Sequence, residues 1–345
     1  MVANAGAGSQ PTTVLAVVVS YKSAHLVRNL LASLVPEREA LAARRVTLRA
    51  VVIDNASGDF EAVSAAVAEL GVGAWIDVIR AERNGGFAYG NNVGFRHGFS
   101  SPEVPDYFFL LNPDTEVRPG AVGALVDFFA QHSDAGVAGS SMELADGQPW
   151  PYAFRYPSLL SELDHGLRFR PVTHLLRDHL VTRPMGNEPE PVDWFPGAAM
   201  MIRRQVIERI GGMDESYFLY FEETDYCRKV KAAGFSIWYV PASRVMHIVG
   251  QSTGVRTADA VRPRLPDYWF ESRKRYFAKN HGLAYAMATD VVLVVAHALG
   301  EVKEALKGKR HSSPPHFARD VLRHSVLLKS NRSIAPSREW TPAVR

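Results

Sequence analysis

The sequence has very little cysteine: Cys227 is the only one in 345 residues. An intrachain disulfide is therefore excluded, and so is a zinc site built from several cysteines. This scarcity fits a reducing compartment such as the cytosol. Residues 1–13 also lack the basic start and apolar run of a signal peptide, and we expect them to form a flexible leader.

An excess of charge of one sign is also missing. The formal net charge is only +3, so the composition gives no reason to expect nucleic acid as a partner. From Lys307 to Arg345, however, nine Lys and Arg stand against Asp320 and Glu339, a local +7 that leaves −4 for residues 1–306. We therefore expect a mildly acidic body and a basic tail at 311–345.

No long uninterrupted hydrophobic run is present. The longest apolar stretch, Leu283 to Leu299, is interrupted by Asp290 and His297 and falls short of the ~20 residues needed to cross a bilayer. We expect an apolar helix at 281–310. Two interpretations stay open: the helix lies at a membrane surface, to which the basic tail adds attraction, or it packs on the protein or on a second subunit.

What is present is a regular alternation of short apolar runs and segments with helical spacing. The expected strands are 14–20, 48–54, 75–81, 107–111 and 136–139, and the expected helices are 26–34, 60–70, 88–99 and 121–131. This order predicts an α/β fold with a mostly parallel central sheet and helices on both faces. Ser20, Asp54, Asn84 and Asn112 follow four of the strands, so we expect them on one ligand-binding rim.

The second half of the chain is less regular at first. Residues 143–192 contain seven prolines, and we interpret them as an insertion over the cleft. Regular patterns then return. They begin at 194–203. The expected strands are 237–240 and 244–247, and the expected helices are 205–210, 222–233 and 268–279, followed by the apolar helix.

The strongest local motif is Asn112-Pro113-Asp114-Thr115, directly after an apolar strand. A carboxylate in such a turn can bind a divalent cation that neutralises the phosphates of a nucleotide sugar, so Asp114 is a candidate metal ligand. These residue types also form ordinary turns, which is the alternative. His247, at another strand end, is a second candidate ligand, although a lone histidine is more often not a ligand.

Two segments point to a nucleotide. Asp54 ends a strand, where its carboxylate could accept a hydrogen bond from the imide nitrogen of uracil or thymine. Ser57 or Asp59 is the better cap for the following helix, which would leave Asp54 free. Residues 83–92 combine a double glycine with asparagines at a helix start, where backbone amides can meet negative charge. A glycine-rich loop without a ligand is the alternative.

Several acids lie among aromatic residues between Asp214 and Asp225. An inverting transfer needs a carboxylate that takes the proton of the attacking hydroxyl, and neighbouring acids and aromatic walls would raise its pKa. We assign this role to Glu223, with Glu222 as the next candidate. Asp225 is expected to be structural and paired with Arg228. A helix start with acids favoured by the dipole would explain the charge but not the aromatic residues.

Taken together, the motifs resemble glycosyltransferase family 2, especially its rhamnosyltransferase-like branch, over about residues 14–280. The resemblance is carried by Ser20-Tyr21, Asp54-Asn55-Ala56-Ser57, Arg83-Asn84-Gly85-Gly86-Phe87, Asn91-Asn92, Asn112-Pro113-Asp114, Gly197-Ala198, Gly212-Met213-Asp214-Glu215, Phe218, Glu222-Glu223-Thr224-Asp225 and His247. It implies a GT-A fold at 14–280, with a nucleotide-binding half at 14–140 and an acceptor half at 141–280.

The resemblance also implies roles for individual residues. Mg²⁺ or Mn²⁺ would be bound through Asp114 and His247 in an inverting single displacement. The implied nucleotide contacts are Ser20, Tyr21, Asp54, Asn84, Gly85, Gly86, Asn91, Asn92 and Asn112, and the implied acceptor contacts are Trp194, Gly197 and Ala198. The usual Glu-Asp pair of the family is Glu222-Glu223 here, so the catalytic base would be a longer side chain.

Members of this family often use dTDP-rhamnose or UDP-linked sugars and build cell-surface polysaccharide on lipid carriers. We therefore expect a dTDP- or UDP-linked donor, a glycan or polyprenyl-linked acceptor, and a cytoplasmic enzyme at the inner face of the cell membrane. The alternatives are a galactofuranosyl, N-acetylglucosaminyl or glucosyl transferase that uses UDP, and a nucleotide-sugar binding protein without catalysis. A sugar-1-phosphate nucleotidyltransferase would need a Gly-rich basic loop after the first strand, which Ser20-Tyr21-Lys22-Ser23 does not provide.

Overall fold

A computed structural model describes residues 11–150, 152–248, 263–308 and 313–343. The first ten residues of the expected leader and the outer ends of the expected basic tail (311, 312, 344 and 345) lie outside the described residues. The strands are β1 Thr12–Ser20, β2 Val46–Asp54, β3 Ile76–Arg80, β4 Tyr107–Leu111, β5 Thr115–Val117, β6 Ala135–Glu143, β7 Pro149–Trp150, β8 Glu190–Pro191, β9 Ala199–Arg203 and β10 Ser236–His247.

All of these strands belong to one sheet, in the order β3-β2-β1-β4-β9-β6-β10-β5, with β7 on β6 and β8 on β10. β1 to β4 are parallel, and β9 lies antiparallel between β4 and β6. The helices are α1 Ala24–Ala42, α2 Phe60–Glu69, α3 Gly86–Ser100, α4 Ala121–Gln131, α5 Leu159–Leu167, α6 Arg170–Leu175, α7 Arg204–Ile210, α8 Glu222–Ala232, α9 Asp267–His281, α10 Leu283–Leu306 and α11 Phe317–His324.

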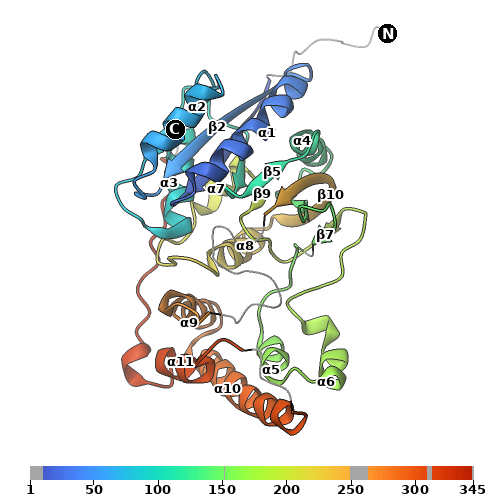
Figure 1. The fold of residues 1–345 in the computed structure, drawn as a ribbon, viewed down its shortest axis with the longest axis vertical. Coiled ribbons are helices and arrows are strands. Elements are labelled where there is room, and N and C mark those ends of the chain that lie inside the picture. The colour runs from blue at the N-terminus through green and yellow to red at the C-terminus, as the bar shows by residue number, and fades with distance from the viewer. Residues whose placement is uncertain (1–10, 151, 249–262, 309–312, 344–345) are drawn as a thin grey trace.

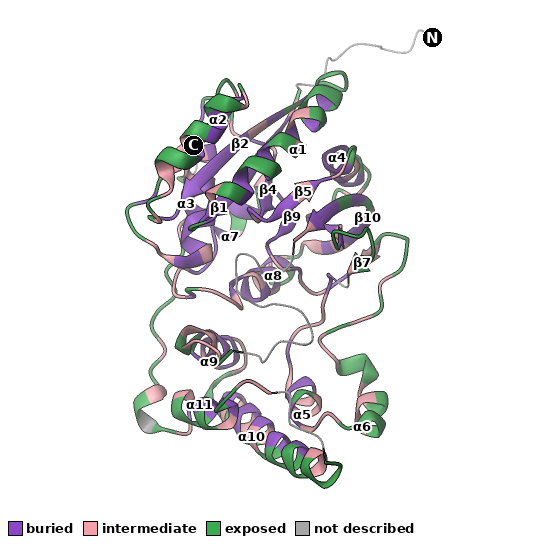
Figure 2. Ribbon diagram, viewed as in Figure 1, coloured by how far each residue is buried: buried purple, intermediate pink, exposed green. Residues whose placement is uncertain are grey.

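The predicted α/β architecture is confirmed. The chain moves from β1 to β3 in one direction along the sheet and from β3 to β4 in the other. Because such crossovers are right-handed, α1 and α2 cover one face and α3 covers the other (Figure 1). Every residue of β4 is buried, as are eight of the nine residues of β1, so the centre of the sheet forms the core (Figure 2).

A layer of helices lies apart from the sheet (Figure 1). α10 packs on α5, α9 and α11, and α9 packs on α11. At its centre the guanidinium of Arg273 bonds Glu162 and Asp290, each at 2.6 Å, and all three side chains are buried. We call α5, α9, α10 and α11 the helical layer. α5 belongs to the proline-rich stretch 143–192, for which we predicted no regular element. Ser158 and Ser161 form a capping box at its start.

Other elements are longer than the pattern predicted. The two strands expected near residues 237 and 244 are one strand, β10, with a break in register between Val240 and Arg244. α1 continues through Pro36 to Ala42. Among the described residues one helix, α10, is long and apolar enough at 24 residues to cross a membrane, by length and composition alone.

Candidate active site

Polar residues that follow the strands meet at one edge of the sheet. Ser20 and Asp54 are register partners at the ends of β1 and β2. Leu111, the last residue of β4, pairs with Val18, so the turn that begins at Asn112 lies beside them. Ligands of parallel α/β sheets bind at this edge, beyond the carboxyl ends of the strands.

Asp114 and His247 are far apart in the sequence and adjacent in the fold. β5 pairs antiparallel with the end of β10, and the register places Thr115 opposite His247. As a result, Nε2 of His247 lies 3.2 Å from Oδ1 of Asp114, and the amide of Ile248 donates to the Asp114 carbonyl. The short strand β5, which no sequence pattern revealed, brings the two candidate metal ligands together.

The loop before β9 lies beside the turn that follows β4. The amide N–H of Asn112 donates to the carbonyl of Ala198 over 3.1 Å. The hydroxyl of Tyr152 donates to the Pro196 carbonyl at 2.6 Å and accepts from the Ala199 amide at 2.8 Å. These bonds fix the loop that the sequence assigned to the acceptor.

The same loop is bonded to Glu223. Oε1 of Glu223 accepts a hydrogen bond of 3.0 Å from the Gly197 amide. Burial raises the pKa of Tyr152, and the negative charges of Glu223 and Asp114 raise it further. One hydroxyl therefore lies within electrostatic range of both carboxylates, and the candidate base and the candidate metal ligand share one short loop.

Glu222 and Glu223 stand in the first turn of α8. Glu222 is buried, and neither of its carboxylate oxygens has a hydrogen-bond partner among the described residues. Burial, followed by the charge of Glu223, holds the pKa of Glu222 well above its usual range. The Glu223 side chain keeps partial access to solvent, while the protein around its carboxylate raises its pKa through desolvation and the Gly197 amide lowers it.

The backbone before these acids is strained. Tyr220 and Phe221 have φ values of 70° and 67°, a region that non-glycine residues rarely adopt. Each such residue costs about 1–3 kcal/mol, and strain of this kind clusters at functional sites. Burial, followed by the charges of Tyr268, Glu222 and Glu223, raises the pKa of Tyr220 to about 12.

The double-glycine loop is held against the acidic segment. Nδ2 of Asn55 donates to Oδ1 of Asn84 and to the carbonyl of Gly86, each over 3.1 Å. Gly86 has φ +82°, and a Cβ atom there would lie 1.7 Å from the Phe218 carbonyl oxygen. The Phe87 amide donates to that oxygen at 3.0 Å. Only glycine allows this close approach.

Several residues expected to contact the nucleotide also make bonds within the protein. Nδ2 of Asn92 donates to the Met213 carbonyl and to Oε1 of Glu215, at 2.8 and 3.0 Å. Oδ1 of Asp54 accepts from the amide and the hydroxyl of Ser57. Asp59 is the N-cap residue of α2, as expected, so Asp54 does not cap this helix. Asp54 is not entirely free, however, because the turn folds Ser57 back onto its Oδ1.

Three further residues expected to contact the nucleotide differ in burial and in their hydrogen bonds: Asn91, Ser20 and Tyr21. Nδ2 of Asn91 donates to the Phe87 carbonyl, while its buried Oδ1 has no partner among the described residues. The Ser20 hydroxyl lies 3.0 Å from that of Ser23 in a buried contact. Tyr21 is exposed at the rim.

Two tryptophans lie near the site. Trp194 stacks on Phe154, and its indole N–H donates to the Arg155 carbonyl at 2.9 Å. Trp150, to which the sequence assigned no role, places its ring 6.0 Å from that of His247. Its position depends on the pairing of β7 with β6, for which the proline-rich sequence gave no signal.

A second acidic group, formed by Asp214, Asp225 and Glu339, has carboxylate oxygens within 4.8 Å of one another. Nζ of Lys279 bonds all three, at 3.0, 2.7 and 3.5 Å, so an ammonium group already balances the cluster. Asp225 is thus held in a salt-bridge network, as expected of a structural residue. The predicted pairing of Asp225 with Arg228 was wrong. α9 brings Lys279 to Asp225, and the Arg228 guanidinium lies over the ring of Tyr156.

Curated relatives agree with the resemblance read from the motifs. An N-acetylglucosaminyl-diphospho-decaprenol L-rhamnosyltransferase of Mycobacterium tuberculosis is 33% identical over 155 residues, which cover 44% of this chain and 50% of the relative. The match therefore spans about half the length of that relative. The rhamnosyltransferase WbbL of Escherichia coli is 27% identical over 217 residues, covering 58% of this chain and 72% of the relative.

Solved structures confirm the GT-A fold. GalNAc-T7 with UDP, GalNAc and Mn²⁺ aligns with a TM-score of 0.55 at 15% identity, covering 92% of this chain and 57% of that one. The mannosyltransferase PcManGT from Pyrobaculum calidifontis, with GDP-Man and Mn²⁺, aligns with a TM-score of 0.50 at 17% identity, covering 94% and 83%. The model of the family described as "Glycosyltransferase like family 2" matches residues 11–279, and the chain therefore belongs to the glycosyltransferase-like family 2.

Proposed function

We propose that the chain transfers a sugar from a nucleoside diphosphate to an acceptor hydroxyl, with inversion at the anomeric carbon. One observation carries the proposal: the loop before β9 is bonded both to the turn of Asp114, through Asn112, and to Glu223, through Gly197. A donor whose diphosphate lies at Asp114 and an acceptor whose hydroxyl lies at Glu223 would meet over this loop.

Glu223 is the proposed base. The acceptor oxygen forms a bond to the anomeric carbon while the bond from that carbon to the diphosphate oxygen breaks, and the hydroxyl proton passes to the Glu223 carboxylate. A raised pKa makes this carboxylate a stronger base once it is ionised, and the Gly197 amide fixes its orientation. Glu222 is the second candidate, and its complete burial makes it less accessible to a hydroxyl.

Asp114 and His247 fit a divalent cation. Their oxygen and nitrogen donor atoms converge within 3.2 Å, and Asp114 is buried at the strand ends. Carboxylate oxygen suits Mg²⁺ and Mn²⁺, and an imidazole donor favours Mn²⁺ of the two. When bound there, the ion would neutralise the charge that develops on the departing diphosphate.

The proposed donor is a dTDP-linked sugar, with L-rhamnose as the first candidate. Support comes from the two rhamnosyltransferases among the relatives. UDP-linked sugars are the second donor class, because thymine and uracil carry the same imide group and a contact through Asp54 would not distinguish them. The donor diphosphate would lie near the double-glycine loop and the N-terminus of α3, where backbone amides favour negative charge.

The proposed acceptor is a glycan or a polyprenyl-linked sugar, bound near Trp194, Gly197 and Ala198. The M. tuberculosis relative carries such a lipid-linked acceptor in its name. The exposed face of α10 is consistent with a lipid-linked substrate. Along it Val291, Val295, Leu299 and Val302 are 45–59% exposed, spaced as one stripe of a helix.

We further propose that this stripe touches the anionic leaflet of a membrane. Exposed Arg319 and Arg323 stand on α11, which packs beside α10, and basic residues near a surface of anionic lipid contribute about 1 kcal/mol each. Sedimentation with phosphatidylglycerol vesicles should carry the wild type down and leave a Val295→Lys/Leu299→Lys variant in solution. A wild-type dimer that this variant dissociates would assign the stripe to a second subunit instead.

The central experiment combines ligand binding with turnover. Melting temperatures are measured with dTDP-, UDP- and GDP-linked sugars in the presence of Mn²⁺, because a ligand that binds only the folded state stabilises it according to its affinity. Asp114→Ala should abolish the Mn²⁺-dependent stabilisation. A wild type that binds a donor and neither hydrolyses nor transfers its sugar would be a binding protein without catalysis.

A further inference from the structure

The end of the chain returns to the sheet. Residues 334–343 lie beyond the family match, which ends at 279, and beyond the helical layer. Figure 1 shows this segment running from the region of α11 up to α3, on the sheet side of the molecule. We call residues 334–343 the C-terminal strap.

The strap is bonded to the segment that leads to the catalytic acids. The Gly212 amide donates to the Trp340 carbonyl at 2.7 Å, and the Glu215 amide donates to the Arg338 carbonyl at 2.8 Å. In return the Arg338 amide donates to Oδ1 of Asp214 at 3.0 Å. These bonds hold residues 211–216, which we call the glycine loop, along the strap.

Two adjacent glycines lie between the strap and the donor-side helix α3. A Cβ atom on Gly211, which has φ +76°, would lie 2.6 Å from the Trp340 carbonyl oxygen. A Cβ atom on Gly212 would lie 2.2 Å from Oδ1 of Asn92. The glycine loop is therefore pressed between the chain end on one side and α3 on the other, with no room for a side chain.

The glycine loop also contacts α3 and the double-glycine loop on the donor side. The Met213 amide donates to Oδ1 of Asn92 at 2.9 Å, and the Asn92 amide donates back to the Met213 carbonyl. Glu215 lies 3.4 Å from Arg96 on α3 and 3.6 Å from Arg83 in the double-glycine loop. The glycine loop is thus bonded to Asn92, an expected nucleotide contact, and paired with Arg83, which precedes Asn84.

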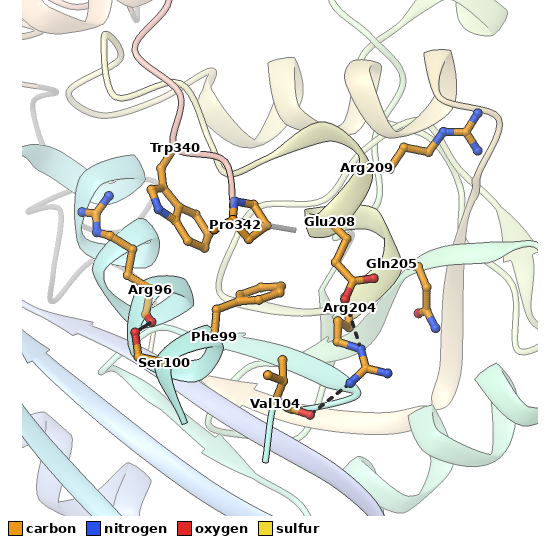
Figure 3. A pocket seen from close by; sticks show the side chains of 11 residues that line it. Arg96, Phe99, Ser100, Val104, Arg204, Gln205, Glu208, Arg209, Trp340 and Pro342 are labelled. Carbon is orange, nitrogen blue, oxygen red and sulfur yellow. Dashed lines mark hydrogen bonds and ion pairs between the residues drawn. The ribbon is translucent and has the colours of Figure 1, made fainter. Parts of the chain in front are cut away.

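Trp340 also touches α3 directly. Its ring lies 5.5 Å from that of Phe99, in an edge-on contact. Figure 3 shows the two side chains beside each other at a pocket between α3 and α7, whose lining also includes Arg204 and Glu208. The pocket has a volume of about 850 Å³. α3 is thus held at its middle, through Asn92, and near its end, through Phe99.

Charge joins the strap to the helix that carries the base. Glu339 bonds Lys229 of α8 at 2.7 Å and Lys279 of α9 at 3.5 Å. Lys279 and Arg275 bond Asp214 in turn. Burial acts to raise the pKa of Asp214, but hydrogen bonds from Arg275 and the charge of Lys279 hold it well below its usual range.

We propose that the C-terminal strap is a positioning element of the donor site. It holds the glycine loop against α3, and through Asn92 and Phe99 it fixes the double-glycine loop in the arrangement that binds the nucleotide. The strap touches no reacting atom. The proposal rests on the proposed function, since it assumes that the rim of the sheet binds a nucleoside diphosphate.

The test compares nucleotide affinity in three variants: deletion of 334–345, Trp340→Ala and the conservative Trp340→Phe. The dissociation constants of dTDP and UDP are measured with Mn²⁺ by calorimetry, at a temperature where circular dichroism shows each variant folded. We expect the deletion and Trp340→Ala to weaken binding about tenfold or more, or 1.4 kcal/mol, with donor KM rising more than kcat falls. Trp340→Phe should restore most of the affinity.

Two controls separate positioning from general stability. Ser333→Ala, at an exposed site just before the strap, should leave the constants unchanged. A synthetic peptide of residues 332–345 should restore nucleotide binding to the deletion variant in a dose-dependent way. If the deletion variant does not fold, the affinity of Trp340→Ala decides the test.

Folded variants with a lower melting temperature and unchanged nucleotide constants would overturn the strap proposal alone. A wild type that binds none of the dTDP-, UDP- and GDP-linked nucleotides would overturn the proposed function and the strap proposal with it.

Discussion

Buried charge is arranged differently at the active-site rim and in the helical layer. In the helical layer, buried Arg273 bonds both Glu162 and Asp290, so each charge has an opposite charge beside it. At the rim, buried Glu222 has no hydrogen-bond partner among the described residues, and Glu223 is held mainly by one backbone amide. A fully paired buried network stabilises one conformation, whereas an unpaired carboxylate has a raised pKa and is suited to proton transfer.

The two regions also differ in the exposure of their apolar side chains. The sheet half encloses its apolar strands, while α10 keeps a stripe of valine and leucine exposed along its outer face. We therefore infer that the sheet half is built around a reaction and the helical layer around packing and contact. Four measurements, from the largest expected effect to the smallest, test that contrast.

Replacing the candidate base should have the largest effect on the reaction. Glu223→Gln keeps the shape of the side chain and removes its ability to accept the proton, so transfer should fall about 10²- to 10⁴-fold in steady-state assays. Nucleotide binding should be retained. Glu61→Gln, at an exposed acid, is the control and should change transfer little. A Glu223→Gln variant that stays active would move the base to Glu222.

Breaking the charge network should have the largest effect on folding. Arg273→Met leaves Glu162 and Asp290 buried without their cation, and we expect a loss of about 3–5 kcal/mol in the free energy of unfolding, measured with urea. Arg323→Met, on the exposed side of α11, should cost less than about 0.5 kcal/mol. Equal effects of the two changes would contradict the paired role of Arg273.

The unpaired carboxyl of Glu222 should make stability depend on pH. Because its pKa is higher in the folded chain than in the unfolded chain, the wild type should lose stability as the pH rises above the ordinary value of about 4.5. Glu222→Gln removes this ionisation. The difference in free energy of unfolding between variant and wild type should therefore grow with pH in denaturation series, and a constant difference would show that Glu222 has a partner in solution.

The exposed stripe of α10 should contribute least to folding. Val295 is 53% exposed, and Val295→Ser should change the free energy of unfolding by less than about 0.5 kcal/mol. Truncation of buried Leu293, two positions earlier, is the matched contrast and should cost about 2–5 kcal/mol. A large destabilisation by Val295→Ser in dilute solution would indicate that the stripe is covered by protein.

Much of the sheet could be predicted because its signals are local. The apolar runs that became β1 and β4 are buried on both faces, as is the second half of β2, and polar residues follow each of them at the rim. Asn112-Pro113-Asp114 and the double glycine stood out for the same reason, since strand ends and tight turns require particular residues. The three residues of β5 were too short to produce any pattern, and α5 was concealed by the surrounding prolines.

The amino-acid sequence by itself determined the order of the elements, the family motifs and the identity of Asp114, His247 and Glu223 as candidates. Only the tertiary structure decided which of them meet: β5 had to pair with β10 before His247 reached Asp114, and the loop before β9 had to bond Glu223. It also decided that Lys279 balances Asp225 and that residues 338–340 lie against the glycine loop. The physical reason is that pairing between residues far apart in the sequence, such as Asp114 and His247, depends on strand register and helix packing, which local sequence patterns do not encode.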